Sequence, residues 1–320
     1  MDEIINKLEY KVMNGQSLCY DEAILLSNTD NAKELYAAAD RIRDKFRGKK
    51  VDLCSIMNAK SGKCSENCKY CAQSGHYNTG VEEYPLIDLE TALKMAKENE
   101  KAGAHRFALV TSGGMLSSKD FDRIIEIFEV LRRETSLHLC ASLGKISYEQ
   151  AVTLKRVGVS MYHHNLETSR SYFTQICDTH TYEDKIDTIR NVIDAGLPIC
   201  SGGIIGLGET MKDRIDMACE LKSLGVKSVP INILNPIQGT PLEKAKRLAP
   251  EEILKTISVF RFIIPDGFIR YAGGRNALGE LQTLGFKAGV NAALVGNYLT
   301  TVGKNIQEDI QTIRELGLDV

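Results

Sequence analysis

The stretch VDLCSIMNAKSGKCSENCKYC, residues 51–71, combines an apolar run of strand length with three cysteines a few residues later. Further apolar runs of similar length follow at 105–112, 137–143, 159–167, 198–206, 227–234, 267–273 and 290–296. Segments with helical periodicity separate these runs, and several of them end at glycine, the usual residue at a helix C-terminus. Strands and helices that alternate in this way predict parallel pairing, and eight of them predict a closed (β/α)₈ barrel of the TIM type.

The runner-up architecture is a doubly wound open sheet. The first strand is not followed by the G-x-G-x-x-G turn of dinucleotide-binding sheets, which disfavours that alternative. Before the first strand, the sequence has helical periodicity without a strand. We therefore predict an N-terminal helical extension over residues 1–46 and one barrel domain over 47–320 that includes a C-terminal helix.

Composition and charge exclude some classes of function. The chain has 320 residues, of which 43% are hydrophobic and 26% charged, and its formal net charge is −2. The sequence has no cluster of basic residues typical of nucleic-acid binding and no apolar run long enough to span a membrane.

The first residues, MDEIINKLEYKV, lack the basic and then apolar order of a signal peptide, so we expect a cytoplasmic protein. In a reducing compartment, its nine cysteines are expected to be ligands, nucleophiles or buried small side chains rather than disulfides.

Cys64, Cys68 and Cys71 have C-x₃-C-x₂-C spacing and follow the first strand, where a barrel places its chemistry. A zinc site with His76 as a fourth ligand is one interpretation. A thioredoxin-like C-x-x-C is disfavoured because a third cysteine precedes it. An iron–sulfur cluster held by three thiolates is favoured, and its fourth iron would be free to bind a substrate.

Tyr70 precedes the last cysteine of this motif, and the whole pattern resembles the signature of the radical S-adenosylmethionine (SAM) superfamily. Within that superfamily the chain resembles the biotin synthase family from about residue 48 to its C-terminus. The segments that carry the resemblance are NAKSGKCSENCKYCAQS, YHHNLETS, CSGGIIGLGET, PINILNPIQGTPLE and IRYAGGR.

The resemblance implies that Cys64, Cys68 and Cys71 bind a [4Fe–4S] cluster whose open iron chelates SAM. Reductive cleavage of SAM would give a 5′-deoxyadenosyl radical that abstracts hydrogen from dethiobiotin. Further cofactor contacts implied for SAM are Tyr70; Thr111, Ser112, Gly113 and Gly114 for its amino group; Asn165 and Glu167 for its ribose; and Gly202, Ile204, Gly206 and Glu209 for its adenine.

Dethiobiotin itself is expected to contact Asn165 and Asn232, the latter through the ureido ring. Two plainer interpretations stay open. The glycines would alone indicate a β-to-α turn, and an isolated Asn232 would more often be a satisfied core amide. His163 stands where familiar members have asparagine; it is a candidate contact of substrate or cluster, or simply a hydrogen-bonding substitute.

The sulfur donor in familiar members is an auxiliary [2Fe–2S] cluster with three cysteine ligands and one arginine. Cys140, Cys200 and Arg270 match three of these ligands, whereas Ala108 stands in place of the fourth. Cys54, on the neighbouring first strand, is a candidate replacement if its side chain points inward, which alternation alone does not decide. Otherwise it is a buried hydrophobe.

Two forms of the auxiliary cluster are compatible with this ligand set. Cys54, Cys140 and Cys200 would hold a [4Fe–4S] cluster whose open iron carries an extra sulfide. Alternatively, Cys54 would replace the missing ligand of a [2Fe–2S] cluster, an option that the retained Arg270 favours. The remaining cysteines, Cys19, Cys177 and Cys219, are expected to be structural.

The partners implied by the resemblance are flavodoxin or ferredoxin as electron donor and a second copy of the chain in a homodimer. The leading function is sulfur insertion into dethiobiotin. Alternatives are another radical SAM enzyme, such as a hydrogenase maturase or methylornithine synthase, and a protein that carries an iron–sulfur or zinc site only for structure or electron transfer.

Overall fold

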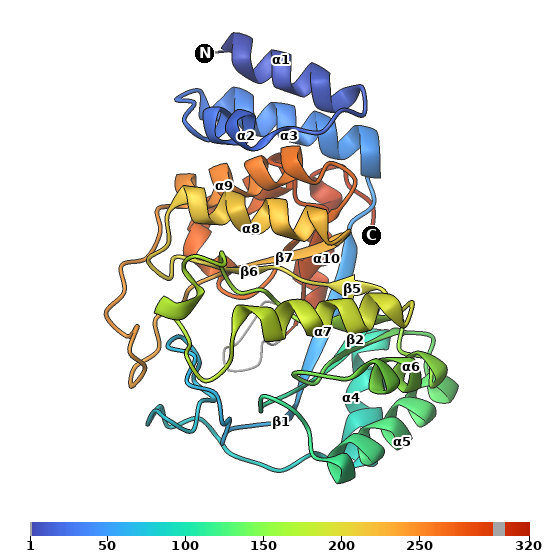
Figure 1. The fold of residues 1–320 in the computed structure, drawn as a ribbon. Coiled ribbons are helices and arrows are strands. Elements are labelled where there is room, and N and C mark those ends of the chain that lie inside the picture. The colour runs from blue at the N-terminus through green and yellow to red at the C-terminus, as the bar shows by residue number, and fades with distance from the viewer. Residues whose placement is uncertain (1, 297–304) are drawn as a thin grey trace.

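Figure 1 shows the computed structural model of the chain, which describes residues 2–296 and 305–320. Met1 of the predicted extension and residues 297–304 of the predicted barrel domain lie outside the described residues. The strands pair in the order β5-β4-β3-β2-β1-β9-β8-β7-β6, all of them parallel, and a further pairing of β5 with β7 closes the ring. Because β5 and β6 are two parts of one interrupted strand, the predicted eight-stranded (β/α)₈ barrel is confirmed.

The strands occupy the predicted apolar runs. Their bounds are β1 (Asp52–Lys60), β2 (Arg106–Thr111), β3 (His138–Ser142), β4 (Met161–His163), β5 (Ile199–Cys200), β6 (Gly203–Ile205), β7 (Ser228–Ile233), β8 (Phe268–Tyr271) and β9 (Ala292–Leu294).

Helices separate consecutive strands and surround the barrel. They are α4 (Leu89–Lys101), α5 (Ser118–Glu134), α6 (Tyr148–Arg156), α7 (Tyr182–Asp194), α8 (Met211–Ser223) and α9 (Pro250–Ile263), with 3₁₀ segments η1 (Phe173–Gln175) and η2 (Arg275–Lys287) and a last helix α10 (Ile306–Glu315). Ser117, Ser147, Thr181 and Thr210 precede four of these helices, and each accepts a hydrogen bond from a backbone N–H of the first turn. No helix within the described ranges is both long and apolar enough to cross a lipid bilayer.

Three helices precede the barrel: α1 (Asp2–Met13), α2 (Tyr20–Ser27) and α3 (Ala32–Arg47). They stack outside α8 and α9 at one side of the molecule (Figure 1). Their buried side chains, among them Leu8 and Leu35, belong to the same hydrophobic cluster as the barrel. Tyr36 donates a hydrogen bond to the carbonyl oxygen of Glu251, 3.2 Å away. This extension therefore shares its core with the barrel.

The register of β1 determines which of its side chains face the barrel interior. Cys54 and Ile56 line the barrel interior, whereas Met57 belongs to the core between barrel and helices and Ser55 bonds to the carbonyl oxygen of Arg106. Cys54 therefore points inward.

The break between β5 and β6 coincides with close backbone packing at Gly202. A Cβ atom on Gly202 would overlap the carbonyl oxygen of Pro230 on the paired strand β7. A plain β-to-α turn does not require two backbones to approach so closely. Gly202 therefore has a structural role of its own, independent of any contact with a cofactor.

We predict that Gly202→Ala lowers the free energy of unfolding by about 1–3 kcal/mol, because the added methyl group forces backbone movement in a closed barrel. Ser201→Ala is the matched control, since the buried Ser201 hydroxyl has no hydrogen-bond partner among the described residues. Urea titrations of both variants measure the difference. Equal stability of Gly202→Ala and the wild type would show that the strand break tolerates a side chain.

Candidate active site

Two adjoining cavities occupy the interior of the barrel and its C-terminal end. The first, here called the loop cavity, has a volume of about 220 Å³ and lies between the loop after β1 and the ends of β2 to β4. The second, the barrel cavity, has a volume of about 300 Å³ and lies deeper. Both are lined by Tyr70, Val110, Ser142, His163, Asn165 and Glu167. Groups bound in the two cavities would therefore face each other across these side chains.

The loop after β1 carries Cys64, Cys68 and Cys71 into the loop cavity. Its curl is fixed by backbone hydrogen bonds, such as Cys64 N–H to the Gln73 carbonyl at 3.0 Å and Lys69 N–H to the Ile176 carbonyl at 2.9 Å. His76, the candidate fourth zinc ligand, instead places Nε2 2.9 Å from the Ser65 carbonyl oxygen. The three cysteines are thus brought to one cavity, and His76 is engaged by its own loop.

The end of β2 forms the opposite wall of the loop cavity with Thr111, Ser112, Gly113 and Gly114. The Ser112 hydroxyl donates a hydrogen bond to the Gly62 carbonyl at 2.7 Å and so ties this wall to the cysteine loop. The buried Thr111 Oγ1 has no hydrogen-bond partner among the described residues. A polar atom left unpaired beside a cavity suits a polar ligand there.

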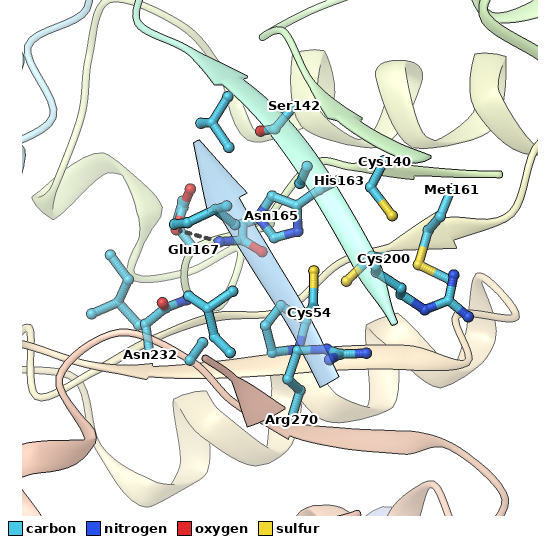
Figure 2. Close-up of a pocket in the computed structure, with 18 of the residues that line it drawn as sticks. Cys54, Cys140, Ser142, Met161, His163, Asn165, Glu167, Cys200, Asn232 and Arg270 are labelled. Carbon is cyan, nitrogen blue, oxygen red and sulfur yellow. Dashed lines mark hydrogen bonds between the residues drawn. The ribbon is translucent and has the colours of Figure 1, made fainter. Parts of the chain in front are cut away.

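Asn165 and Glu167 follow β4 at the boundary between the cavities. Glu167 adopts a φ of 72°, in the left-handed region that a non-glycine residue seldom occupies. Its carboxylate accepts a hydrogen bond from Asn165 Nδ2 at 3.4 Å, drawn in Figure 2, and Asn165 Oδ1 accepts one from the Gly202 N–H at 3.1 Å. Burial raises the pKa of Glu167. Both side chains are held facing the space where the resemblance expects a ribose.

Cys54, Cys140 and Cys200 project from β1, β3 and β5 into the barrel cavity, as Figure 2 shows. All three are buried. Cys54 Sγ donates a hydrogen bond to the Ser55 carbonyl at 3.6 Å, and Cys140 Sγ donates one to the His138 carbonyl at 3.7 Å. The neighbouring Cys140 thiol and burial together raise the pKa of Cys54. Cys200 Sγ accepts a hydrogen bond from the Ser228 hydroxyl at 3.2 Å. These thiols lie together although no two of them are neighbours in sequence.

Ala108 lies where the sequence analysis expected a vacated ligand position. It pairs with Cys140 on β3 and with Ile56 on β1, and it packs in one small apolar cluster with Cys54, Cys140 and Leu294. Cys54 is therefore beside the alanine, as an inward side chain on the neighbouring strand should be.

Arg270 borders the barrel cavity from β8 and is almost fully buried. Its Nη2 lies 2.5 Å from the Asp52 carboxylate, and its Nη1 donates to the carbonyl oxygens of Asp52 at 3.2 Å and Ala293 at 3.3 Å. Arg106 Nε bonds to the same carboxylate at 3.0 Å. Although burial opposes ionisation, the two arginines lower the pKa of Asp52. The floor of the cavity is thus an ion-pair network in which Arg270 has little freedom.

The other predicted residues divide between the cavities. Asn232 lines the barrel cavity; its Oδ1 accepts from the Gly273 N–H at 2.9 Å and its Nδ2 donates to the Gly203 carbonyl at 3.2 Å. Burial lowers the pKa of His163 to about 4, so this imidazole is neutral near pH 7. Ile204 lines the barrel cavity, not the loop cavity.

Gly206 packs under Leu248 and donates its N–H to Glu209, 2.8 Å away, and Glu209 in turn forms a buried ion pair with Arg214. These contacts give Gly206 and Glu209 a structural role and do not bring them to the lining of either cavity. Their predicted adenine contact stays a prediction.

The structure adds residues that the sequence analysis did not assign to the site. Cys177 Sγ lies 3.7 Å from Cys68 Sγ and 3.2 Å from His180 Nδ1, and His180 lies 2.6 Å from the Glu66 carboxylate. Among the described residues, these are the ones whose ligand atoms come close enough for a single metal ion, with Cys68, Cys177 and His180 mutually within 4.8 Å. The C-x₂-H spacing of residues 177–180 was the signal available in the sequence.

Comparisons with known proteins identify the family. The Radical SAM superfamily matches residues 59–221, and the Biotin and Thiamin Synthesis associated domain matches residues 230–319. The chain is 58% identical to the biotin synthase of Acetivibrio thermocellus over 319 residues, covering 99% of this chain and 100% of the relative. It is 54% identical to the biotin synthase of Clostridium tetani over 323 residues, covering 100% and 99% of the two chains.

Solved structures agree on the fold. A crystal structure of methylornithine synthase superposes with a TM-score of 0.84 at 20% identity, covering 98% of this chain and 96% of that one. A maturase of the [FeFe]-hydrogenase gives a TM-score of 0.86 at 16% identity, covering 99% and 76%. Sequence identities as low as these show that the fold is shared and show nothing about function. Identities above 50% over the full length, in contrast, show that this chain belongs to the biotin synthase family of radical SAM proteins.

Proposed function

We propose that the protein is a radical SAM sulfurtransferase that inserts sulfur into dethiobiotin to form biotin, and that it draws the sulfur from an auxiliary iron–sulfur cluster. The observation that carries this proposal is the pair of adjoining cavities, each lined by three cysteines. An enzyme that only cleaved SAM would have no need of the second set. Substrate bound between the two sets would meet a radical source on one side and a sulfur source on the other.

The loop cavity fits a [4Fe–4S] cluster and SAM. Cys64, Cys68 and Cys71 offer three thiolates, and wall residues beside them offer polar groups, including the unpartnered Thr111 hydroxyl. When bound, cluster and SAM supply a 5′-deoxyadenosyl radical, the hard chemistry that side chains lack. The chain's part is to position both: Tyr70, which is partly buried and lines both cavities, would stand between the cysteine loop and the substrate and help to exclude water.

The barrel cavity fits an auxiliary cluster on Cys54, Cys140 and Cys200. The arrangement of Arg270 favours thiolate ligation alone, because its Nη atoms are already committed to Asp52 and Ala293. We therefore prefer the [4Fe–4S] form with an extra sulfide over the [2Fe–2S] form with an arginine ligand. In this form Arg270 is a cationic neighbour that stabilises thiolates by its charge.

Asn232 is placed to recognise dethiobiotin. Of the hydrogen bonds that its amide can make, the structure uses one from the oxygen and one from the nitrogen, which leaves polar capacity facing the cavity. We predict that Asn232→Ala raises KM for dethiobiotin about tenfold and has a smaller effect on kcat, since one lost hydrogen bond is worth about 1–1.5 kcal/mol. Steady-state kinetics with varied dethiobiotin measure the split. An unchanged KM would remove Asn232 from the substrate site.

Cys177 is placed to tune the first cluster. When Cys68 binds iron as a thiolate, the Cys177 thiol 3.7 Å away becomes a hydrogen-bond donor to that sulfur. Hydrogen bonds to cluster sulfurs stabilise the reduced state, so Cys177→Ala should lower the reduction potential of the cluster. Potentiometric titration followed by electron paramagnetic resonance measures the shift, with Cys219→Ala as the control. A potential equal to that of the wild type would leave Cys177 a packing residue.

The proposal also covers the electron donor, the assembly, the location and the division of the chain. We propose flavodoxin or ferredoxin as the electron donor, a homodimer as the assembly and the cytoplasm as the location. We also propose that residues 1–46 form an extension to a catalytic barrel of residues 47–320. The order of the elements, with three helices before β1, supports the division of the chain.

Anaerobic incubation of the reconstituted protein with reductant, SAM and dethiobiotin tests the function. We expect 5′-deoxyadenosine and biotin in the same mixture. Formation of 5′-deoxyadenosine without biotin would favour another radical SAM activity, such as that of a maturase or methylornithine synthase. Absence of both would leave an iron–sulfur protein without radical chemistry.

A further inference from the structure

A third cavity lies at the N-terminal end of the barrel, opposite the loop cavity. This basal cavity has a volume of about 490 Å³. Its walls come from the end of α3 and the beginnings of β1, β2, β3 and β8. Neither the radical chemistry nor the substrate site proposed above uses it. In TIM barrels this end normally serves stability, so a cavity here needs its own explanation.

The lining of the basal cavity is cationic. Arg47, Lys50 and Arg106 border it together with His138, against one carboxylate, Asp52. Arg47 is held in place over the ring of Phe268, with its guanidinium carbon 3.6 Å from the ring centre. A concave surface with an excess of positive charge raises the local concentration of small anions and speeds their association.

The basal cavity and the barrel cavity share Arg106, one member of the ion-pair network at the floor of the barrel cavity. Arg106 lines both cavities and forms an ion pair with Asp52. On the barrel side of this network lie Cys54, Cys140 and Cys200. An anion beside Arg106 in the basal cavity would therefore lie next to the ion-pair network that borders the proposed auxiliary-cluster site.

Of the two arginines on Asp52, Arg106 is the one that can move. Arg270 is bound to Asp52 and Ala293, and its side chain is 5% exposed. Arg106 contributes one nitrogen, Nε, to Asp52, and its side chain is 16% exposed. Because Asp52 keeps Arg270 as a partner, rotation of Arg106 toward the basal cavity would not leave a buried carboxylate unpaired.

From this geometry we infer that the basal cavity is a binding site and inlet for hydrosulfide, which passes Arg106 to reach the auxiliary-cluster site. The inference rests on the proposed function, in which each biotin formed removes one sulfur that must be replaced. Hydrosulfide carries a negative charge that suits the cationic lining, and it is small enough to pass a single side chain. It crosses with its proton, so passage needs no oxidant or reductant. Supply from this end also avoids the loop cavity, which SAM and its products occupy.

Uptake of labelled sulfide after one turnover tests the inlet. Holoenzyme first makes biotin anaerobically, is desalted, and then receives [³⁵S]sulfide; acid-labile ³⁵S on the protein is followed with time and normalised to the biotin made. We expect the uptake rate of the wild type to fall as salt is added. The uptake rate of Lys50→Glu/His138→Glu should be lower by roughly fivefold and should depend less on salt. Lys94→Glu, an exposed lysine on α4, is the matched control and should take up label as wild type does.

The possible results distinguish failure of the proposed inlet from failure of the proposed sulfurtransferase function. Biotin in the first turnover, together with equal uptake by the double variant and Lys94→Glu, would overturn the inlet and leave the sulfurtransferase intact. No biotin from the wild type would overturn the function itself. Lys50→Glu alone changes one exposed side chain and should give an intermediate rate, which keeps the test decisive if the double variant folds poorly.

Discussion

Cys71→Ala protein should form no 5′-deoxyadenosine, a loss of at least about a thousandfold, because the reaction depends on a cofactor that two thiolates cannot hold in a reactive form. Cys71 lies in the loop cavity with Cys64 and Cys68, and few other soft ligands are near enough to replace it. The variant should also contain about four fewer irons per chain, as expected for the loss of one [4Fe–4S] cluster. Anaerobic reconstitution, iron analysis and chromatography of SAM products measure both effects.

Cys219→Ala is the control for this loss. Cys219 is a half-buried thiol on α8, so it tests for non-specific effects of removing a cysteine. It should retain its iron and its SAM cleavage. Substantial 5′-deoxyadenosine from Cys71→Ala would mean that Cys177 or His180 rescues the cluster, or that the loop cavity is not the radical site.

Cys54→Ser protein should separate the two halves of the reaction. Biotin formation should fall to about 1% of wild type or less, since the auxiliary cluster loses a ligand that Ala108 cannot supply. Formation of 5′-deoxyadenosine should continue, because Cys54 lines only the deeper cavity. The ratio of biotin to 5′-deoxyadenosine, measured in one incubation, reports this uncoupling.

Cys19→Ser, on the surface, is the matched control and should keep the wild-type ratio. If Cys54→Ser lost both products together, the variant would be unfolded or the first cluster damaged, and circular dichroism with iron analysis distinguishes these. If it kept both products, Cys54 would be a buried side chain without a role in sulfur supply.

The sequence predicted the fold well because parallel strands and their helices have local signatures. The apolar runs, the helix caps and the glycine stops each lie within a dozen residues, and the barrel follows from their order. The need for glycine at position 202 was not predicted, because it depends on the carbonyl of Pro230 on another strand.

The site was predictable where a motif is contiguous and less so where it is assembled by the fold. Cys64, Cys68 and Cys71 are close in sequence, whereas Asp52 on β1 and Arg270 on β8 meet across the strand between them, β9. That ion pair is the reason we propose Arg270 as a charged neighbour of the auxiliary cluster and not as an iron ligand. The approach of Cys177 to Cys68 likewise depends on how the segment after β4 folds back over the cysteine loop.

The central claim is that Cys54, Cys140 and Cys200 hold a second cluster that supplies sulfur. Mössbauer spectroscopy of ⁵⁷Fe-reconstituted wild-type and Cys54→Ser protein, with sulfide analysis of the same samples, tests it most directly. We predict two cluster signals in the wild type, with more sulfide than iron, and only the signal of the first cluster in the variant. A variant that retains the full second signal would contradict this account.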